Sequence, residues 1–252
     1  MIKSKKLSKI KYLQHGFFNS VGGKSKNIFK SLNCGLGSND KKLNVKKNLE
    51  IVKKKISRNA KDIFLLQQVH SNRFVYIDSK YKTKKKPKVD AVITNQRNLP
   101  IAVLTADCSP ILIYDKKKRI IAAIHAGWKG AYKGIINRVI KFMIKKGCEL
   151  KNMIAVIGPS ISFKNYEVKE DFKKKFIKKN KKNNIFFKVN QNRLYFNLTG
   201  YIMSSLRSNK IKHIDILKID TFNIKNKFFS ARRALKLKHN DYGRNISIIM
   251  LN

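Results

Sequence analysis

The hydrophobic pattern is dominated by short, continuous apolar runs in the middle and at the end of the chain. Residues 101–105 and 120–124 are apolar at nearly every position, and neither run alternates with polar residues. Runs of this length without alternation are typical of strands buried on both faces. We therefore predict strands there and at seven further runs of similar character. These further runs are residues 64–69, 74–77, 90–94, 111–114, 153–157, 214–219 and 246–251.

Apolar residues at helical spacing mark four other segments. The clearest is 132–146, where Ile135, Val139 and Met143 recur at intervals of four residues and Gly147 provides a stop. This pattern predicts one helix over the whole segment. Further helices are predicted at residues 43–56, 168–178 and 198–209.

The order of these elements predicts the fold class. Strands and helices are mixed without strict alternation, which favours an α+β fold with layered α/β/β/α architecture and mixed sheets over a doubly wound parallel sheet. Residues 80–88 form a basic connector between two predicted strands. The chain has 252 residues, only 4 prolines and no Pro- or Ser-rich linker, so we predict a single domain over residues 1–252.

Charge is the most extreme feature of the composition. The chain has 58 lysines and arginines against 14 aspartates and glutamates, which gives a formal net charge of +44. Such a total is typical of proteins with a nucleic-acid or anionic-membrane partner. The basic residues, however, are mostly lysines spread over the whole length, rather than localised arginine-rich stripes with interleaved aromatics. We therefore favour a compositional bias, which predicts no specific nucleic-acid binding.

Cysteine usage and hydropathy narrow the cellular context. The chain has three cysteines, Cys34, Cys108 and Cys148, and an odd, sparse set argues against a secreted disulfide framework. Residues 1–13 are basic but lack the apolar segment of a signal peptide. No stretch is long and apolar enough to span a bilayer. We expect a soluble cytoplasmic protein without a membrane partner, as a monomer or a homodimer.

Three reactive side chains lie at the ends of predicted strands. His70 follows the run 64–69, Cys108 comes shortly after 101–105, and His125 follows 120–124. Strand ends are held in place by the sheet, so side chains there converge with little loss of entropy. Two imidazoles and a thiolate suit Zn²⁺, and three protein ligands leave the fourth tetrahedral position open for catalysis. A thiolate also accepts copper, so ligand type alone leaves the metal open.

Other interpretations use the same atoms. Residues so far apart in sequence often never meet, and the pattern alone favours two hydrogen-bonded histidines and an independent buried thiol. Alternatively, Cys108 and His125 form a nucleophile–base pair that Asp107 or Asp90 orients, as in a cysteine–histidine hydrolase. The metal hypothesis predicts bound zinc, whereas the nucleophile hypothesis predicts a covalent intermediate.

A set of short motifs adds a family resemblance. Around the three reactive residues lie Gln68-Val69-His70, Asp90-Ala91, Thr105-Ala106-Asp107-Cys108 and His125-Ala126-Gly127-Trp128-Lys129-Gly130. Further motifs are His15-Gly16-Phe17, Gly22-Gly23-Lys24-Ser25, Ser31-Leu32-Asn33, Gly158-Pro159-Ser160-Ile161, Tyr166-Glu167-Val168, Phe228-Phe229-Ser230 with Arg232-Arg233, and Gly243-Arg244. In combination, and nearly end to end, the chain resembles the multicopper polyphenol oxidase or laccase-domain family.

This resemblance implies a metal site and an activity. The family's zinc ligands are the histidine of Gln-Val-His, the cysteine of Ala-Asp-Cys and the histidine of His-Ala-Gly-Trp, which correspond to His70, Cys108 and His125. The family is associated with zinc-dependent purine nucleoside phosphorylase activity. The resemblance therefore implies phosphorolysis of adenosine, inosine and 5′-methylthioadenosine by inorganic phosphate, together with adenosine deamination.

Two alternatives remain within the same family. Its inherited name implies a copper-dependent polyphenol oxidase. Some members are described as peptidoglycan editing factors, which makes the cysteine–histidine hydrolase an alternative acting on peptidoglycan precursors.

The motifs also supply candidates for substrate binding and proton transfer. Asn33, Gln68, Lys129 and Arg233 are the candidate substrate-binding residues. Asp107, Cys108 and His125 are the candidate catalytic residues, with Asp107 as general acid or base. The alternative for Asn33 and Asp107 is turn capping, which short polar side chains often perform.

Two more arginines and the single tryptophan belong to the same motifs. Arg232 and Arg244 are further candidates for holding phosphate or ribose oxygens, because a guanidinium offers a bidentate fork. Trp128 is either a stacking wall for a purine or a packing residue beneath its loop.

The chain departs from the family pattern at three places. It has Ser20 where the family commonly has arginine, Lys164-Asn165 where two cysteines are frequent, and Asp220-Thr221 where Cys-Thr is frequent. Of the motif cysteines only Cys108 is present, which argues against a multi-thiolate or multicopper centre. Loss of the arginine removes one candidate anion contact.

Overall fold

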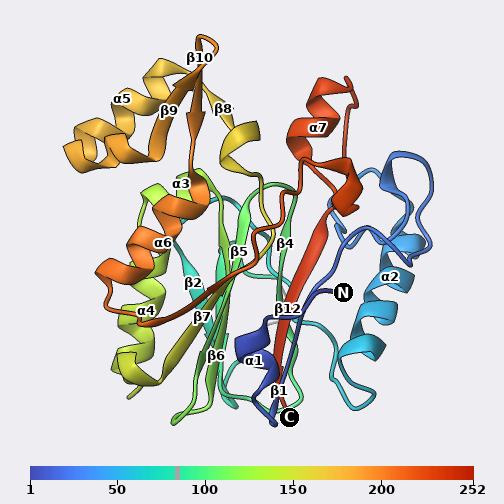
Figure 1. The fold of residues 1–252 in the computed structure, drawn as a ribbon. Coiled ribbons are helices and arrows are strands. Elements are labelled where there is room, and N and C mark those ends of the chain that lie inside the picture. Colours follow the sequence, from blue (N-terminus) through green and yellow to red (C-terminus); the bar gives the residue numbers. More distant parts are fainter. Residues whose placement is uncertain (83–85) are drawn as a thin grey trace.

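Two β-sheets packed face to face form the centre of the molecule, and helices cover both outer faces (Figure 1). The computed structural model describes residues 1–82 and 86–252, so residues 83–85 of the basic connector predicted at 80–88 lie outside the described residues. The predicted α+β class and the layered α/β/β/α arrangement with mixed sheets are confirmed.

The larger sheet has six strands in the order β11-β7-β5-β6-β3-β2. Its outer pairs β11–β7 and β2–β3 are parallel, and the remaining neighbours are antiparallel. All residues of β3, β5, β6 and β7 are buried, as their continuous apolar runs predict. The strands are β2 (Phe74–Ile77), β3 (Ala91–Thr94), β5 (Ser109–Asp115), β6 (Ile120–Ala126), β7 (Met153–Ile157) and β11 (His213–Ile216).

The second large layer is an antiparallel sheet of three strands in the order β1-β12-β4. The strands are β1 (Leu13–Phe17), β4 (Ile101–Thr105) and β12 (Asn245–Leu251). The core between the two sheets is apolar from both sides, with Leu112, Ile121 and Val156 facing Val103 and Ile249. Full burial of each such side chain contributes about 1.5–3 kcal/mol, so this interface holds the two layers together.

Helices α3 (Trp128–Tyr132), α4 (Ile135–Lys145) and α6 (Leu198–Ser208) cover the outer face of the six-stranded sheet. Helix α2 (Lys42–Ile56) covers the three-stranded sheet from the opposite side. The single helix predicted at 132–146 is wrong in one respect. Gly134 has a φ of 81°, a conformation that breaks α-helical geometry, so the helix α4 begins only at Ile135 and Tyr132 is the last residue of the separate helix α3.

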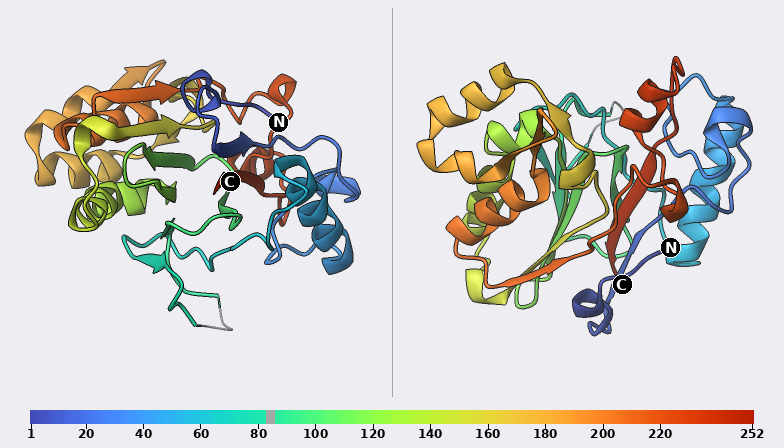
Figure 2. Two further views of the ribbon diagram at one scale, coloured as in Figure 1. Left: turned by 90° about the horizontal axis from the view of Figure 1, so that it is seen from below. Right: turned by 45° about the horizontal axis from the view of Figure 1, so that its top comes forward.

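A small third sheet lies beyond α6, and α5 (Glu170–Lys179) packs against it (Figure 2). Its strands are β8 (Glu167–Val168), β9 (Phe187–Asn190) and β10 (Arg193–Phe196), in the order β8-β10-β9.

The remaining helices of the chain are short. They are α1 (Lys5–Ser8), α7 (Ala231–Lys236) and the 3-10 turns η1 (Asn27–Phe29), η2 (Leu150–Asn152), η3 (Phe163–Asn165), η4 (Lys181–Phe186) and η5 (Ile224–Asn226). Among the described residues, every helix is too short or too polar to span a bilayer.

The strand predicted at 64–69 is wrong. Only Phe64 makes a β-bridge, to Ile101 of β4, and residues 65–69 form no ladder. The physical reason is that the backbone in this segment bonds to separate partners: the Gln67 amide donates to the Pro87 carbonyl and the Val69 amide to the Asp90 carboxylate. The apolar residues Leu65 and Leu66 are nevertheless buried, which explains the apolar run.

A buried histidine ties the N-terminal segment to both large sheets. His15 of β1 is almost fully buried, and its Nε2 accepts a hydrogen bond of 2.9 Å from the amide of Ser4. The Ser4 hydroxyl donates to Asp215 of β11 at 2.5 Å. Burial, with help from the Lys3 charge, lowers the pKa of His15 to about 4, although the Ser4 hydrogen bond and Asp215 oppose the shift. His15 is therefore neutral in the fold at neutral pH.

We predict that His15 makes the protein less stable as the pH falls from about 6.5 to about 4. In that window the unfolded chain binds a proton at this position and the folded chain does not. The loss is on the order of 3 kcal/mol, since each pKa unit corresponds to about 1.4 kcal/mol. Denaturant unfolding of wild type and His15→Gln across this range measures it. The variant loses this part of the pH dependence, while His213→Gln, at an exposed histidine, keeps it; equal slopes for wild type and His15→Gln contradict the prediction.

Candidate metal centre

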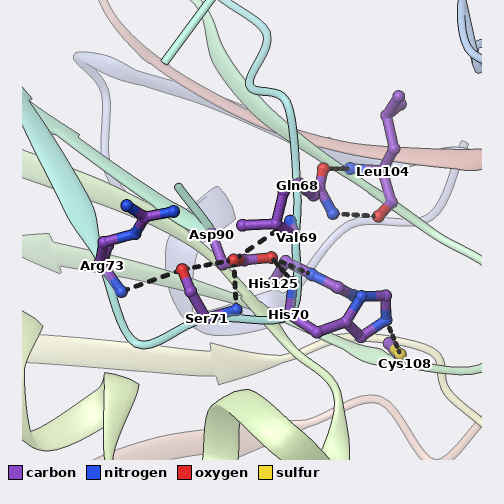
Figure 3. Close-up of polar contacts among 9 residues, drawn as sticks. All are labelled: Gln68, Val69, His70, Ser71, Arg73, Asp90, Leu104, Cys108 and His125. Carbon is purple, nitrogen blue, oxygen red and sulfur yellow. Dashed lines mark hydrogen bonds and ion pairs between the residues drawn. The ribbon is translucent and has the colours of Figure 1, made fainter. Parts of the chain in front are cut away.

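His70, Cys108 and His125 converge at one end of the two sheets (Figure 3). Their ligand atoms all lie within 4.8 Å of one another, and the Cys108 Sγ is 3.9 Å from the His70 Nε2. The two imidazole rings meet edge to face, with centroids 4.7 Å apart. His125 is buried, whereas His70 is exposed, so the cluster opens to solvent on the His70 side.

Sheet topology explains why Cys108 meets His125. The chain leaves the three-stranded sheet at the end of β4 and enters the six-stranded sheet at the start of β5, and Cys108 lies in the connection. In the antiparallel pair β5–β6, Pro110 is directly opposite His125. Cys108 therefore lies beside the end of the strand that carries His125.

Asp90 fixes both histidines. Its Oδ1 is 2.9 Å from Nδ1 of His125, which leaves Nε2 of that ring free to face Cys108. The same carboxylate accepts backbone hydrogen bonds from Val69, His70 and Ser71, and a further one from the Ser71 hydroxyl. His70 has a φ of 56°, and these bonds hold its backbone in that left-handed conformation. A carboxylate behind a histidine in this way orients the ring for a metal.

Gln68 holds the segment before His70 against β4. Its side-chain amide donates to the Leu104 carbonyl at 2.7 Å and accepts from the Leu104 amide at 2.7 Å. The side chain thus pairs with the strand edge in the way a neighbouring peptide group would. This arrangement aligns His70 with the strand end although residues 65–69 form no strand.

The electrostatics of the cluster favour a thiolate. Burial alone raises the pKa of Cys108, but His125 and His70 outweigh it and lower that pKa below its ordinary value. Burial lowers the pKa of His125, whereas the Cys108 thiolate and Asp90 raise it above its ordinary value. For Asp90, hydrogen bonds from His125 and Ser71 overcome the effect of burial and hold the pKa at about 2. The Cys108 thiolate is thus stabilised by a protonated His125, whose proton a bound metal ion would replace.

These residues fit a zinc ion. Zinc binds thiolate at about 2.3 Å and imidazole nitrogen at about 2.0–2.1 Å, so its ligand atoms lie about 3.5 Å apart in a tetrahedron. The Cys108 Sγ and His70 Nε2 lie 3.9 Å apart and all the ligand atoms lie within 4.8 Å of one another, so small movements bring them to this spacing. Two imidazole nitrogens, one thiolate and a carboxylate behind one histidine are the donor set of a catalytic zinc site.

A pocket of about 500 Å³ opens beside the three residues. Leu36, Leu65, Leu66 and Leu104 form its apolar wall. Arg244 lines it too, where the guanidinium pairs with Asp241 at 2.7 Å and stacks on the ring of Tyr242 at 4.0 Å. The volume is within the range of about 300–1,000 Å³ that is typical of small-molecule sites.

The predicted substrate residues Asn33 and Gln68 lie near this pocket, but their polar atoms are engaged. Asn33 is fully buried, and its amide nitrogen donates to Ser38 and Asp40. Its oxygen accepts from the backbone amides of Gly35 and Arg244. Gln68 thus lines the pocket, while Asn33 holds the backbone of Gly35 and Arg244, which line it.

The predicted substrate residues Lys129 and Arg233 lie away from the three ligands. Lys129 is exposed on α3, with Nζ 5.6 Å from the ring centroid of Trp128, and that ring packs on Phe172. Arg233 turns toward the loop before α7, where Nη1 donates to the carbonyls of Thr221 and Phe222. Neither residue lines the pocket beside the cluster.

Asp107 lies next to Cys108 but its carboxylate points into a buried network. It accepts from the Thr221 and Ser230 hydroxyls at 2.7 and 2.9 Å and from the Arg232 amide at 2.7 Å. Burial raises its pKa, and the three hydrogen bonds oppose that shift. Its φ of 84° makes the sharp turn that presents Cys108. The capping alternative describes these contacts well.

Sequence reasoning missed three contributors to the site. The sequence patterns give no role to Ser71 and Tyr242, and they identify Asp90 only as an orienter of the alternative nucleophile pair of Cys108 and His125. A signal existed for Ser71, which directly follows a candidate ligand. For Tyr242 the signal was its place two residues before Arg244. Cys34 and Cys148 are both buried, and burial raises the pKa of both thiols.

Comparison with known proteins identifies the family of the chain and its relatives. The family model described as "Multi-copper polyphenol oxidoreductase laccase" matches residues 14–252. A Rickettsia prowazekii protein named purine nucleoside phosphorylase RP494 is 37% identical over 71% of this chain and 74% of its own length. A Bacteroides thetaiotaomicron protein named purine nucleoside phosphorylase is 29% identical over 100% of this chain and 96% of its own length.

Solved structures resemble the whole fold. Neisseria meningitidis protein NMB0706 superposes with a TM-score of 0.85 at 26% identity, over 96% of each chain. Bacillus licheniformis hypothetical protein YfiH gives 0.87 at 26% identity, over 95% of this chain and 93% of the other.

We predict that Asp90→Asn lowers zinc affinity by about 10- to 100-fold, because an amide fails to hold His125 and the residues around His70 at once. Competition with a chelator measures the affinity. Asp115→Asn is the matched control, since Asp115 is a buried carboxylate of β5 that accepts backbone hydrogen bonds from Lys117, Lys118 and Glu149. Equal zinc affinity in wild type and Asp90→Asn would refute the role given to Asp90.

We also predict that Gly127→Ala weakens zinc binding without unfolding the protein. A Cβ at this position lies 2.7 Å from the Cys108 Sγ and 3.0 Å from Cδ2 of His70, so both side chains must move. Gly37→Ala is the control, because its Cβ meets nothing within 4 Å. Zinc titration with circular dichroism separates the two effects. Unchanged affinity in Gly127→Ala would show that the ligands lie elsewhere.

Proposed function

This chain belongs to the multi-copper polyphenol oxidoreductase laccase family, and from that premise we propose that it is a zinc-dependent purine nucleoside phosphorylase. The observation that carries the proposal is the cluster of His70, Cys108 and His125 at the edge of a ligand-sized pocket. Relatives that match most of the chain are named purine nucleoside phosphorylase, which supports this choice of reaction.

The proposed substrates are adenosine, inosine and 5′-methylthioadenosine, with inorganic phosphate as the second substrate. A phosphate oxygen forms a bond to C1′ of the sugar, and the bond from C1′ to the purine nitrogen breaks. The electron pair leaves with the purine, which takes one proton from the phosphate group. The enzyme has to hold phosphate and sugar in line and stabilise the departing base.

The residues of this chain have distinct tasks in that reaction. His70, Cys108 and His125 are the proposed metal ligands, and Asp90 holds the ring of His125 and the backbone of His70. A zinc ion bound there supplies a Lewis acid for a phosphate or sugar oxygen. Gln68 keeps the His70 segment aligned with β4, and the leucine wall of the pocket limits the access of water to the metal ligands.

We extend the proposal to adenosine deamination at the same centre, as the family resemblance implies. Release of ammonia from adenosine without phosphate tests this second activity separately. We further propose a cytoplasmic location, which the three free cysteines support, since none is engaged in a disulfide.

A single metal centre favours the phosphorylase over the copper-dependent polyphenol oxidase. Among the described residues, His70, Cys108 and His125 are the one group of three or more histidine, cysteine or acidic side chains arranged to hold a metal. Oxidation of phenolic dyes by the copper-loaded protein is the matching test of the alternative.

We predict that Cys108→Ala abolishes zinc binding and lowers kcat/KM for phosphate-dependent inosine cleavage at least about a hundredfold. The reason is that metal-assisted charge stabilisation contributes several kcal/mol, and about 1.4 kcal/mol corresponds to a factor of ten. Release of hypoxanthine with and without phosphate, together with metal analysis, measures both effects.

Cys148→Ala is the matched control, because Cys148 is a buried cysteine in the core under α4 and keeps no contact with the pocket. It is expected to retain zinc and activity. Full turnover by metal-free wild type would replace the zinc proposal with the cysteine nucleophile. Purine release that needs no phosphate would point to a hydrolase instead.

A further inference from the structure

A second, smaller pocket lies on the other side of Cys108. Its volume is about 320 Å³, and it shares Ala106, Cys108 and Tyr242 with the larger pocket. The candidate metal centre thus stands where two pockets meet. Residues of α7 line the smaller pocket, together with Ile161 and Tyr166 before β8 and Leu198 at the start of α6.

The smaller pocket is mainly apolar. Ile161, Leu198, Ala231 and Leu235 contribute aliphatic surface, and the ring of Tyr166 adds an aromatic wall. Desolvating a phosphate ion in such surroundings is costly, whereas a flat heteroaromatic base gains from them. The larger pocket is the more polar of the two, with Gln68, His70 and Arg244 on its surface. The smaller pocket therefore suits a heteroaromatic base, and the larger pocket suits a phosphate ion.

Arg232 is the cation of the smaller pocket. Its Nη1 donates to the Glu167 carbonyl at 2.9 Å, and its guanidinium carbon lies 5.5 Å from the ring centroid of Tyr166. Within the described part of the chain, no carboxylate forms an ion pair with it, in contrast to Arg244, which pairs with Asp241. Nη2 and Nε therefore keep their donors for a ligand.

The Tyr166 hydroxyl is the second donor of this pocket. Burial raises the pKa of the phenol, so the group keeps its proton at neutral pH. None of the hydrogen bonds between described residues engages this hydroxyl. The nearby Asp107 carboxylate is covered on both oxygens by Thr221, Ser230 and the Arg232 amide. The pocket thus offers donors to a ligand and no free acceptor carboxylate.

We propose that the smaller pocket binds the purine base, and that Arg232 makes it prefer 6-oxopurines to 6-aminopurines. An arginine fork donates to two neighbouring acceptors, and a 6-oxopurine presents them as O6 and N7. A 6-aminopurine has an amino donor in place of O6 and cannot accept both bonds. The larger pocket then receives the phosphate, with the sugar beside the metal ligands. This inference rests on the proposed function.

Binding of free bases tests the proposal without turnover. The probes are hypoxanthine and adenine, titrated into the zinc-loaded protein by calorimetry. Wild type is expected to bind hypoxanthine at least about tenfold more tightly, because hydrogen bonds from a charged donor contribute about 1.5–3 kcal/mol. Arg232→Gln is expected to abolish this preference. Arg207→Gln, which removes an exposed arginine of α6, is expected to keep it.

A second variant keeps the test decisive if Arg232→Gln folds poorly. Tyr166→Phe removes only a hydroxyl and is expected to weaken base binding several-fold, with KM for phosphate unchanged. Equal affinity of wild type for adenine and hypoxanthine overturns the assigned preference. A rise in KM for phosphate alone in either variant overturns the assignment of the pockets. Base binding without any phosphate-dependent turnover would instead contradict the proposed function and leave this subsite supported.

Discussion

The carboxylate of Asp90 is the constraint on which the candidate site depends. It is fully buried and joins two segments that are far apart in the sequence: the ring of His125 on β6 and the backbone around His70. With four further hydrogen bonds from Val69, His70 and Ser71, the carboxylate is saturated. A single group thus sets the tautomer of one histidine and the backbone conformation of the other. Both rings are placed before any metal binds, which lowers the entropic cost of forming the centre.

The second constraint is the place where the chain passes from one sheet to the other. The connection between β4 and β5 carries Asp107 and Cys108. The network of Asp107 with Thr221, Ser230 and Arg232 ties this connection to α7. Because the connection runs between the layers, space opens on either side of Cys108, and two pockets with different linings result. A metal ion held by Cys108 would lie beside both pockets, which suits a reaction between two dissimilar substrates.

The sequence predicts the layers well because burial on both faces leaves an unmistakable pattern. The runs that became β3, β4, β5, β6 and β7 are short and apolar at almost every position, which is typical of strands buried on both faces. The run at 64–69 includes Gln67 and Gln68 and forms no strand beyond the bridge at Phe64, because its polar groups bond to Leu104 and to the Asp90 carboxylate, which the sequence alone does not reveal. Arg232 and Arg233 show the same limit: only the fold decides that the first lines a pocket and the second binds a loop.

The charge of the chain and the chemistry of the site are largely separate. Several of its few carboxylates stabilise the backbone and do not pair with lysines. Backbone hydrogen bonds at turns or strand ends are accepted by Asp90, Asp107, Asp115 and Asp220. Lysine is concentrated on solvent faces such as that of α2. Exposed charges act over a Debye length of about 8 Å at physiological salt, so they influence how quickly an anion arrives rather than how it is held. Recognition therefore depends on the few polar groups inside the pockets.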